Sequence, residues 1–152
     1  HQGETAVEIP IAASIPHSYI RRETDRLAMY KRIALVETDD DVLDVQDEMI
    51  DRYGEIPQAV RNLLFIGKLK ADASKAYVTK LSVKDGEARL VLDARAPMKL
   101  EKLMSLVQKT QGAQLTNAEE PSLVIRRRNA DVSAFCRDLP QFVYTLGDCI
   151  EG

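Results

Sequence analysis

The strongest constraint on how this chain folds is a change of hydrophobic period between residues 71 and 77. Before this point, apolar residues recur every three to four positions in three stretches, which is the spacing of amphipathic helices. After it, residues 77–83 and 88–92 alternate in polarity as strands do, and Asp85 and Gly86 lie between them. An Asp-Gly pair tolerates the positive φ that a tight hairpin turn needs. The sequence therefore predicts three helices followed by a β-hairpin.

The three helices have ends that can be read from the sequence. The first is expected over residues 24–36. The second is expected to begin at a capping box formed by Thr38 and Asp41 and to end at Gly54. Pro57 is expected in the first turn of the third. The apolar face expected for the first helix is Leu27, Tyr30, Ile33 and Ala34. The apolar face expected for the second is Val42, Val45, Met49 and Ile50.

The C-terminal half continues with a mixture of helices and short strands. A fourth helix is expected to open with Pro97 and to close at Gly112, followed by strands at residues 113–116 and 122–127. A last helix is expected from Asp131, and Pro140 must kink or split it because proline lacks an amide hydrogen.

The order of these elements predicts the class of fold. Residues 7–11 alternate in polarity, which indicates a short edge strand or an extended arm. We expect an α+β fold with three N-terminal helices, a β-hairpin and further short strands in a small mixed sheet, and helices packed against it. The chain starts at His1 rather than at Met, so we expect a fragment of a larger protein.

The sequence shows no pattern typical of a catalytic or cofactor site. Its seven glycines are isolated, whereas a phosphate-binding loop needs clustered glycines beside a helix start. Cys136 and Cys149 have no histidine nearby in the sequence, and we expect buried, inert thiols. No nucleophile is paired with a base, and no two acids are matched for hydrolysis. We therefore expect no catalytic, cofactor-binding or metal-binding residue and no enzymatic activity in this chain.

Net charge argues against one further class of protein, and hydropathy excludes another. Lys and Arg total 21 against 24 Asp and Glu, a formal net charge of -3, whereas a domain that binds nucleic acid is normally basic. No apolar run approaches the roughly 18 residues of a membrane-spanning helix. Because the chain has two cysteines and no signal-peptide pattern, we expect a cytoplasmic location and no membrane partner.

The most unusual stretch, from Glu37 to Glu55, holds nine acidic residues and one basic residue. Four of the acids share one helix face: Asp41, Asp44, Glu48 and Asp51. Like charges at this spacing repel one another by a few tenths of a kcal/mol per pair. This predicted acidic row has three interpretations: a solvated helix face, a docking face for an arginine-rich partner, or a hard-metal site, which needs converging oxygens.

Two basic clusters suggest an alternative function. One is the triplet Arg126, Arg127 and Arg128, whose alternate side chains point to opposite faces of a strand. The other flanks the first helix and is interleaved with acids: Arg21, Arg22, Arg26, Lys31 and Arg32. Both are typical of solvated or locally paired charges, and the alternative is a module that contacts DNA or RNA polymerase.

Motifs in about the first 70 residues resemble one known family. They are the runs IPIAASIPHSYI at 9–20, RLAMYKRIA at 26–34 and DRYGEIP at 51–57, with shorter matches at 62–64 and 68–70. In this order and at this separation they are similar to the C-terminal domain of the bacterial transcription-repair coupling factors (Mfd). The remaining residues agree in length and in the order of elements.

The resemblance implies that residues 1–152 are the C-terminal regulatory domain of a much larger protein. Full-length members of the family are ATP-driven DNA translocases that remove stalled RNA polymerase and recruit the excision-repair protein UvrA. Their ATP and magnesium belong to motor modules that precede this domain, so no cofactor is implied here. The C-terminal domain acts as a latch: it packs on an N-terminal module resembling UvrB and covers the surface that UvrA needs.

The resemblance also implies which residues make the latch contact. In the family they are acids on the helix before an Asp-Arg-aromatic-Gly motif, which match Glu48 and Asp51, and Asp44 and Asp41 extend the same row. The hypothesis is competitive masking, in which the latch and UvrA use the same basic residues. Weak ion pairs suit a contact that must open, because tethering gives the latch a high effective concentration.

Overall fold

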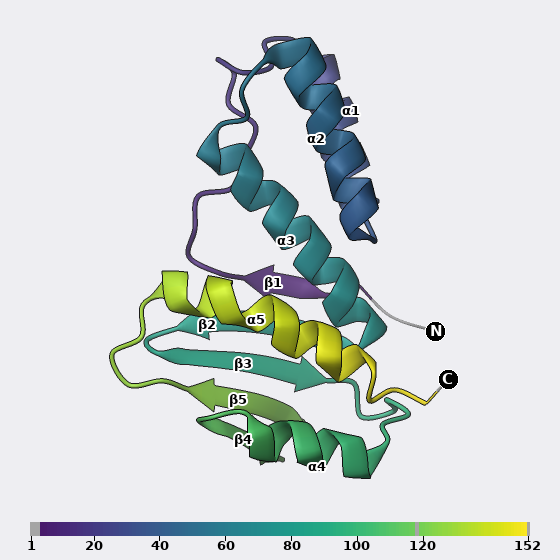
Figure 1. Ribbon diagram of the computed structural model, residues 1–152, viewed down its shortest axis with the longest axis vertical. Coiled ribbons are helices and arrows are strands. Elements are labelled where there is room, and N and C mark those ends of the chain that lie inside the picture. Colours follow the sequence, from purple (N-terminus) through teal and green to yellow (C-terminus); the bar gives the residue numbers. More distant parts are fainter. Residues whose placement is uncertain (1–3, 118, 152) are drawn as a thin grey trace. The chain divides into compact units, whose positions relative to one another are not determined.

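The structure is a computed structural model that describes residues 4–117 and 119–151, so His1 lies outside the described residues. The chain divides into two compact units (Figure 1). The sheet unit combines the N-terminal segment up to Pro10 with the chain from Asp72 onward, and the helical unit is Ile11–Ala71. The boundary between them falls within α3 (Gln58–Lys75).

The sheet unit contains a five-stranded mixed sheet with the order β1-β2-β3-β5-β4. Its strands are β1 (Ala6–Glu8), β2 (Val78–Lys84), β3 (Glu87–Leu92), β4 (Ala113–Thr116) and β5 (Ser122–Arg126). β1 pairs with β2 in parallel at one edge, and the other neighbouring strands are antiparallel. The predicted α+β class, the hairpin and the edge strand are confirmed.

The hairpin turn has the backbone conformation that its sequence predicts. Asp85 and Gly86 have φ angles of 50° and 75°. The Arg127 N–H donates a hydrogen bond of 2.9 Å to the Gly86 carbonyl oxygen. A Cβ at Gly86 would lie 3.1 Å from the Arg127 carbonyl oxygen, so both the φ angle and the close approach favour glycine. The turn therefore sets the register in which Leu81 pairs with Leu90.

Two helices cover one face of this sheet (Figure 1): α4 (Leu100–Lys109) and α5 (Val132–Gly147). α5 buries Phe135, Leu139, Phe142, Val143 and Leu146. The helix continues through Pro140 without a break. The predicted split is therefore wrong, and the predicted kink stays a prediction. The fourth helix begins at Leu100 rather than Pro97, because Met98 forms a bridge with Ile150 and the Lys99 N–H donates to the Cys149 carbonyl oxygen at 2.6 Å.

The helical unit is built from α1 (Glu23–Ala34), α2 (Asp39–Tyr53) and most of α3. The capping box of Thr38 and Asp41 is present at the start of α2. Gly54 ends the helix with a φ of 87°, and its N–H donates to the Ile50 carbonyl oxygen at 3.0 Å. Pro57 lies directly before α3 and its carbonyl oxygen accepts from two N–H groups of the first turn. The predicted capping box and the Gly54 helix end are confirmed, whereas Pro57 precedes the first turn of α3 instead of lying in it.

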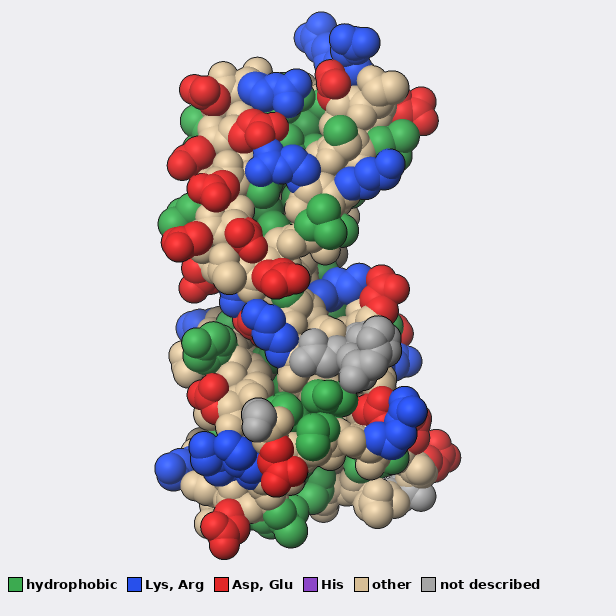
Figure 2. All heavy atoms as spheres, turned by 90° about the vertical axis from the view of Figure 1, so that its right-hand side faces the viewer, with side chains coloured by type: hydrophobic (Ala, Val, Ile, Leu, Met, Phe, Trp, Pro, Cys, Tyr) green, Lys and Arg blue, Asp and Glu red, His purple; other side chains and the backbone are tan. Residues whose placement is uncertain are grey.

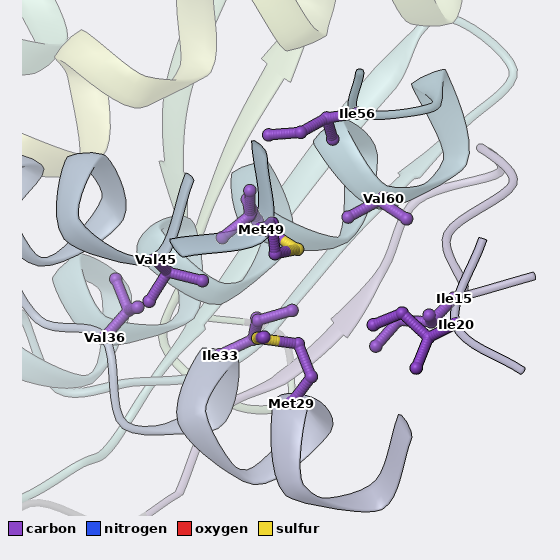
Figure 3. Packing of buried hydrophobic residues seen from close by; sticks show 10 residues of the cluster. Ile15, Ile20, Met29, Ile33, Val36, Val45, Met49, Ile56 and Val60 are labelled. Carbon is purple, nitrogen blue, oxygen red and sulfur yellow. The ribbon is translucent and has the colours of Figure 1, made fainter. Parts of the chain in front are cut away.

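The three helices enclose one apolar core (Figure 3). Its buried side chains are Ile15, Ile20, Met29, Ile33, Val36, Val45, Met49, Ile56, Val60 and Leu64. Hydrogen bonds fasten the preceding arm to it: the Ile15 N–H donates to the Tyr30 hydroxyl at 2.8 Å, and the Tyr19 hydroxyl donates to the Gly54 carbonyl oxygen at 2.9 Å. Buried apolar surface holds α1 and α2 together, and these hydrogen bonds attach the arm to both helices.

Three residues predicted for the core face solvent instead. Leu27 and Ile50 are 53% and 51% exposed, and Ala34 is exposed. In α1 the buried pair is Met29 and Ile33, four residues apart, which leaves Leu27 outside the contact line. Ile50 follows the buried Met49, and each helical residue is turned by about 100° from the one before. A helix that packs along one line therefore cannot bury both Met49 and Ile50.

We expect Met49→Ala to lower the free energy of unfolding of the helical unit by about 2–5 kcal/mol, because it leaves a cavity in a close-packed core. The matched control is Ile50→Ala, the next residue on the same helix, which should change it by less than about 0.5 kcal/mol. Urea denaturation followed by circular dichroism measures both. Equal losses for the two variants would contradict the packing described here.

Candidate partner-docking site

The acidic residues of α2 face outward because the opposite side of the helix is fixed in the core. Val45 and Met49 are four residues apart and buried, so they define the inward face. Asp39, Asp40 and Asp41 occupy the first turn, where the positive end of the helix dipole stabilises carboxylates. Figure 2 shows acidic side chains gathered along one side of the helical unit, with hydrophobic side chains among them.

Two residues of the predicted acidic row, Asp44 and Asp51, are fully available to a partner. Both are exposed and lie seven residues apart, two turns along one face of α2. Within residues 4–117 and 119–151, neither carboxylate takes part in an ion pair or a hydrogen bond. Nothing in the described structure offsets their charge.

Glu48, by contrast, is engaged by the chain's own arginines. Arg32 of α1 forms an ion pair and hydrogen bond with Glu48 Oε1, and Arg52 Nη1 lies 3.2 Å from Glu48 Oε2. The Glu48 side chain is 36% exposed, so each pair is screened by water and contributes about 0.2–1 kcal/mol. The carboxylate therefore links α2 to α1.

Asp41 is also engaged within the unit. Its Oδ2 accepts from the Glu37 N–H at 2.9 Å and from the Thr38 N–H at 3.1 Å. Its own N–H donates to Thr38 Oγ1 at 3.1 Å, which completes the capping box. The structure thus brings Asp44 and Asp51 together on an open face, whereas Asp41 caps the helix and Glu48 joins two helices.

Prediction from the sequence missed part of the exposed face. A residue seven positions from another lies on the same side of a helix, and the residues opposite Val45 and Met49 are centred on Asp47. We call this face the α2 ridge; its members are Asp40, Leu43, Asp44, Asp47, Ile50 and Asp51. All six are exposed. The buried pair Val45 and Met49 locates the ridge on the opposite side of the helix. The spacing of the acids alone does not locate it.

Several residues of the basic clusters are paired within the chain. Arg126 Nε lies 3.0 Å from Glu87 Oε1, and Arg127 forms an ion pair with Asp138. The Arg127 guanidinium holds the pKa of the Asp138 carboxyl below its usual value. Beside α1, Arg26 donates to the carbonyl oxygens of two preceding residues. This pairing does not favour a phosphate-binding surface, so the DNA-contacting alternative gains no support.

Among the described residues, no group of three or more His, Cys, Asp or Glu side chains is arranged to hold a metal ion. Within the same residues, no helix has both the length and the apolar character that crossing a membrane requires. Cys149 is buried and Cys136 is partly buried, and burial raises the pKa of both thiols.

Comparison with known proteins gives consistent matches over this chain. The model of one protein family, the TRCF domain, matches residues 9–103. The transcription-repair-coupling factor of Myxococcus xanthus is 36% identical over 113 residues, which cover 73% of this chain. That of Staphylococcus haemolyticus is 32% identical over 93 residues, or 61% of this chain. The matched residues span only 9% and 8% of these relatives' lengths.

A solved structure extends the similarity to nearly the whole chain. A crystal structure of the C-terminal domain of a transcription-repair coupling factor superposes with a TM-score of 0.85. It covers 98% of this chain and 95% of that one, at 24% identity. This match shows a shared fold that includes residues beyond 103, where the family model ends.

We expect both cysteines to react slowly with iodoacetamide at neutral pH, because a raised pKa lowers the fraction of reactive thiolate. The rate should rise with pH above the usual range of a cysteine pKa, and Cys149 should react more slowly than Cys136 because it is more deeply buried. Mass spectrometry of timed samples measures both rates, with the urea-unfolded chain as the control. Rapid labelling of the folded chain at pH 7 would contradict the buried-thiol assignment.

Proposed function

The chain belongs to the TRCF domain family of transcription-repair coupling factors, and from this premise we propose that it is a non-catalytic, autoinhibitory interaction domain. It docks through the acidic face of α2 on the UvrB-like N-terminal module of its own parent protein and masks the surface that UvrA binds. The observation that carries this proposal is the pair of exposed carboxylates, Asp44 and Asp51, that have no partner within the described residues.

A contrast with three acids of the sheet unit supports a docking role. Glu87, Asp93 and Asp138 each lie within ion-pair distance of an arginine of the sheet unit. On α2 the outward carboxylates repel one another and lack such partners, so bringing guanidinium groups to this face would relieve the repulsion. A basic surface on another module provides such groups.

Glu48 and Asp51 have different roles in this proposal. Asp51 contacts the partner directly, because its carboxylate is exposed and uncompensated. Glu48 is already bound to Arg32 and Arg52, so it holds α2 in place against α1 and adds negative charge at the edge of the contact. Reversal of Glu48 would therefore act through both charge and helix position.

The strength of the contact fits a reversible latch. Exposed ion pairs contribute about 0.2–1 kcal/mol each, which is too little for tight binding between separate molecules. A tethered domain has an effective concentration in the millimolar range, at which a contact of about 4 kcal/mol is half closed. The ion pairs therefore act together with other contacts, and the latch stays closed until another interaction competes. Competition then exposes the surface for UvrA.

The proposal assigns no chemical step to this chain. In the parent protein, ATP and magnesium belong to motor modules, and the parent acts on DNA and on stalled RNA polymerase in the cytoplasm. The part of the chain described here contributes regulation through one of its surfaces.

We expect Glu48→Lys combined with Asp51→Lys, in the full-length parent protein, to raise its affinity for UvrA roughly tenfold, which corresponds to about 1.4 kcal/mol of lost masking. The physical reason is that two lysines repel the basic surface that the latch covers. Biolayer interferometry with immobilised UvrA measures the affinity.

The matched control reverses two exposed acids away from α2, Glu23→Lys and Glu101→Lys, with the same change in net charge. This control should leave the affinity for UvrA unchanged. An unchanged affinity in the α2 variant would refute the masking role of Glu48 and Asp51.

A further inference from the structure

The α2 ridge carries two exposed aliphatic side chains in addition to its acids. Leu43 is 54% exposed and Ile50 is 51% exposed, although each could contribute to a core. They lie seven residues apart and therefore on the same side of α2. Four carboxylates lie beside them along the ridge, on the side away from the core contact: Asp40, Asp44, Asp47 and Asp51.

We propose that Leu43 and Ile50 are the apolar anchors of the docking contact and that the ridge fits a protein surface with an apolar recess bordered by arginine or lysine side chains. This inference rests on the proposed function and specifies the chemistry of the partner. Stable interfaces commonly combine apolar and polar groups, and the ridge places two aliphatic side chains beside four carboxylates. The anchors supply buried area and the carboxylates set register.

The charges of the ridge select the class of partner. Within the described residues none of its four carboxylates has an ion-pair partner, although Asp39 on the neighbouring face lies 3.8 Å from Lys68 and Glu48 binds two arginines. A nucleic acid or an anionic membrane would be repelled by this row. A metal ion needs oxygens that converge, and these carboxylates follow a straight helix face. A basic protein surface satisfies both the charge and the aliphatic side chains.

Under the proposed function, such a surface belongs to another part of the parent protein. The matched residues span only 8–9% of the relatives' length, so the greater part of such a protein lies outside this chain. Under the proposed function, the occupant of the ridge is the basic face of the N-terminal module. A tethered partner of this kind needs only a small contact, because its effective concentration is high.

The test uses the full-length parent protein and its affinity for UvrA. Leu43→Gln with Ile50→Gln removes the anchors, keeps the charge, and does not lower the helix propensity of either position. Asp44→Asn with Asp47→Asn and Asp51→Asn removes charge but keeps shape. Leu27→Gln with Leu100→Gln alters two leucines off the ridge that are at least half exposed, as the anchors are, and is the matched control.

We expect the anchor variant and the charge variant each to raise the affinity for UvrA about tenfold, and the control to leave it unchanged. The gain from the charge variant should fall as salt increases, since salt screens exposed charges, whereas the gain from the anchor variant should persist. Thermal unfolding of each variant by circular dichroism verifies that the domain remains folded.

Two results would overturn the inference in distinguishable ways. If the charge variant raises the affinity and the anchor variant behaves like the control, the aliphatic anchors are refuted while masking by the acids stands. If neither variant differs from the control, the ridge is not the covered surface, and the proposed function fails with the inference.

Discussion

The packing of α2 through Val45 and Met49 determines the rest of the candidate site. Both side chains lie in the apolar core of the helical unit, and Met49 has no exposed surface. Burying these two residues fixes the rotation of the helix about its axis, since each residue is turned by about 100° from the last. The same rotation points Asp47 and its neighbours outward and leaves Glu48 beside α1. One apolar contact thus sorts the acids into those that are used internally and those that are not.

Local ion pairs also distinguish the acids that are compensated within the chain from those that are not. On the helical unit, Arg32 and Arg52 both bind Glu48, and Lys68 lies 3.8 Å from Asp39. In the sheet unit, Arg126 and Arg127 bind Glu87 and Asp138. Excess negative charge therefore remains concentrated on the α2 ridge, although the net charge of the whole chain is only -3. A surface of this kind favours a basic partner and disfavours nucleic acid.

Features that depend on a few neighbouring residues could be predicted from the sequence. The Asp85-Gly86 turn, the Thr38 capping box and the Gly54 helix end follow from backbone preferences, and all three are present. Errors arose where distant segments compete for the same groups. The fourth helix starts late because residues 98 and 99 bond to the chain's C-terminal segment instead of continuing the helix. Ile50 is exposed because Met49 takes the core position.

The sequence by itself determined the family, the α+β class, the order of the elements and the acidic character of α2, because these rest on motifs, periodicity and charge counts along the chain. Only the tertiary structure decided the strand order and which acids remain open. One helix face carries Asp41, Asp44, Glu48 and Asp51. Glu48 nevertheless binds Arg32, a residue 16 positions away, whereas Asp44 and Asp51 face solvent. Spacing along one helix does not report which cations a neighbouring helix brings close, and that proximity decides where charge is compensated.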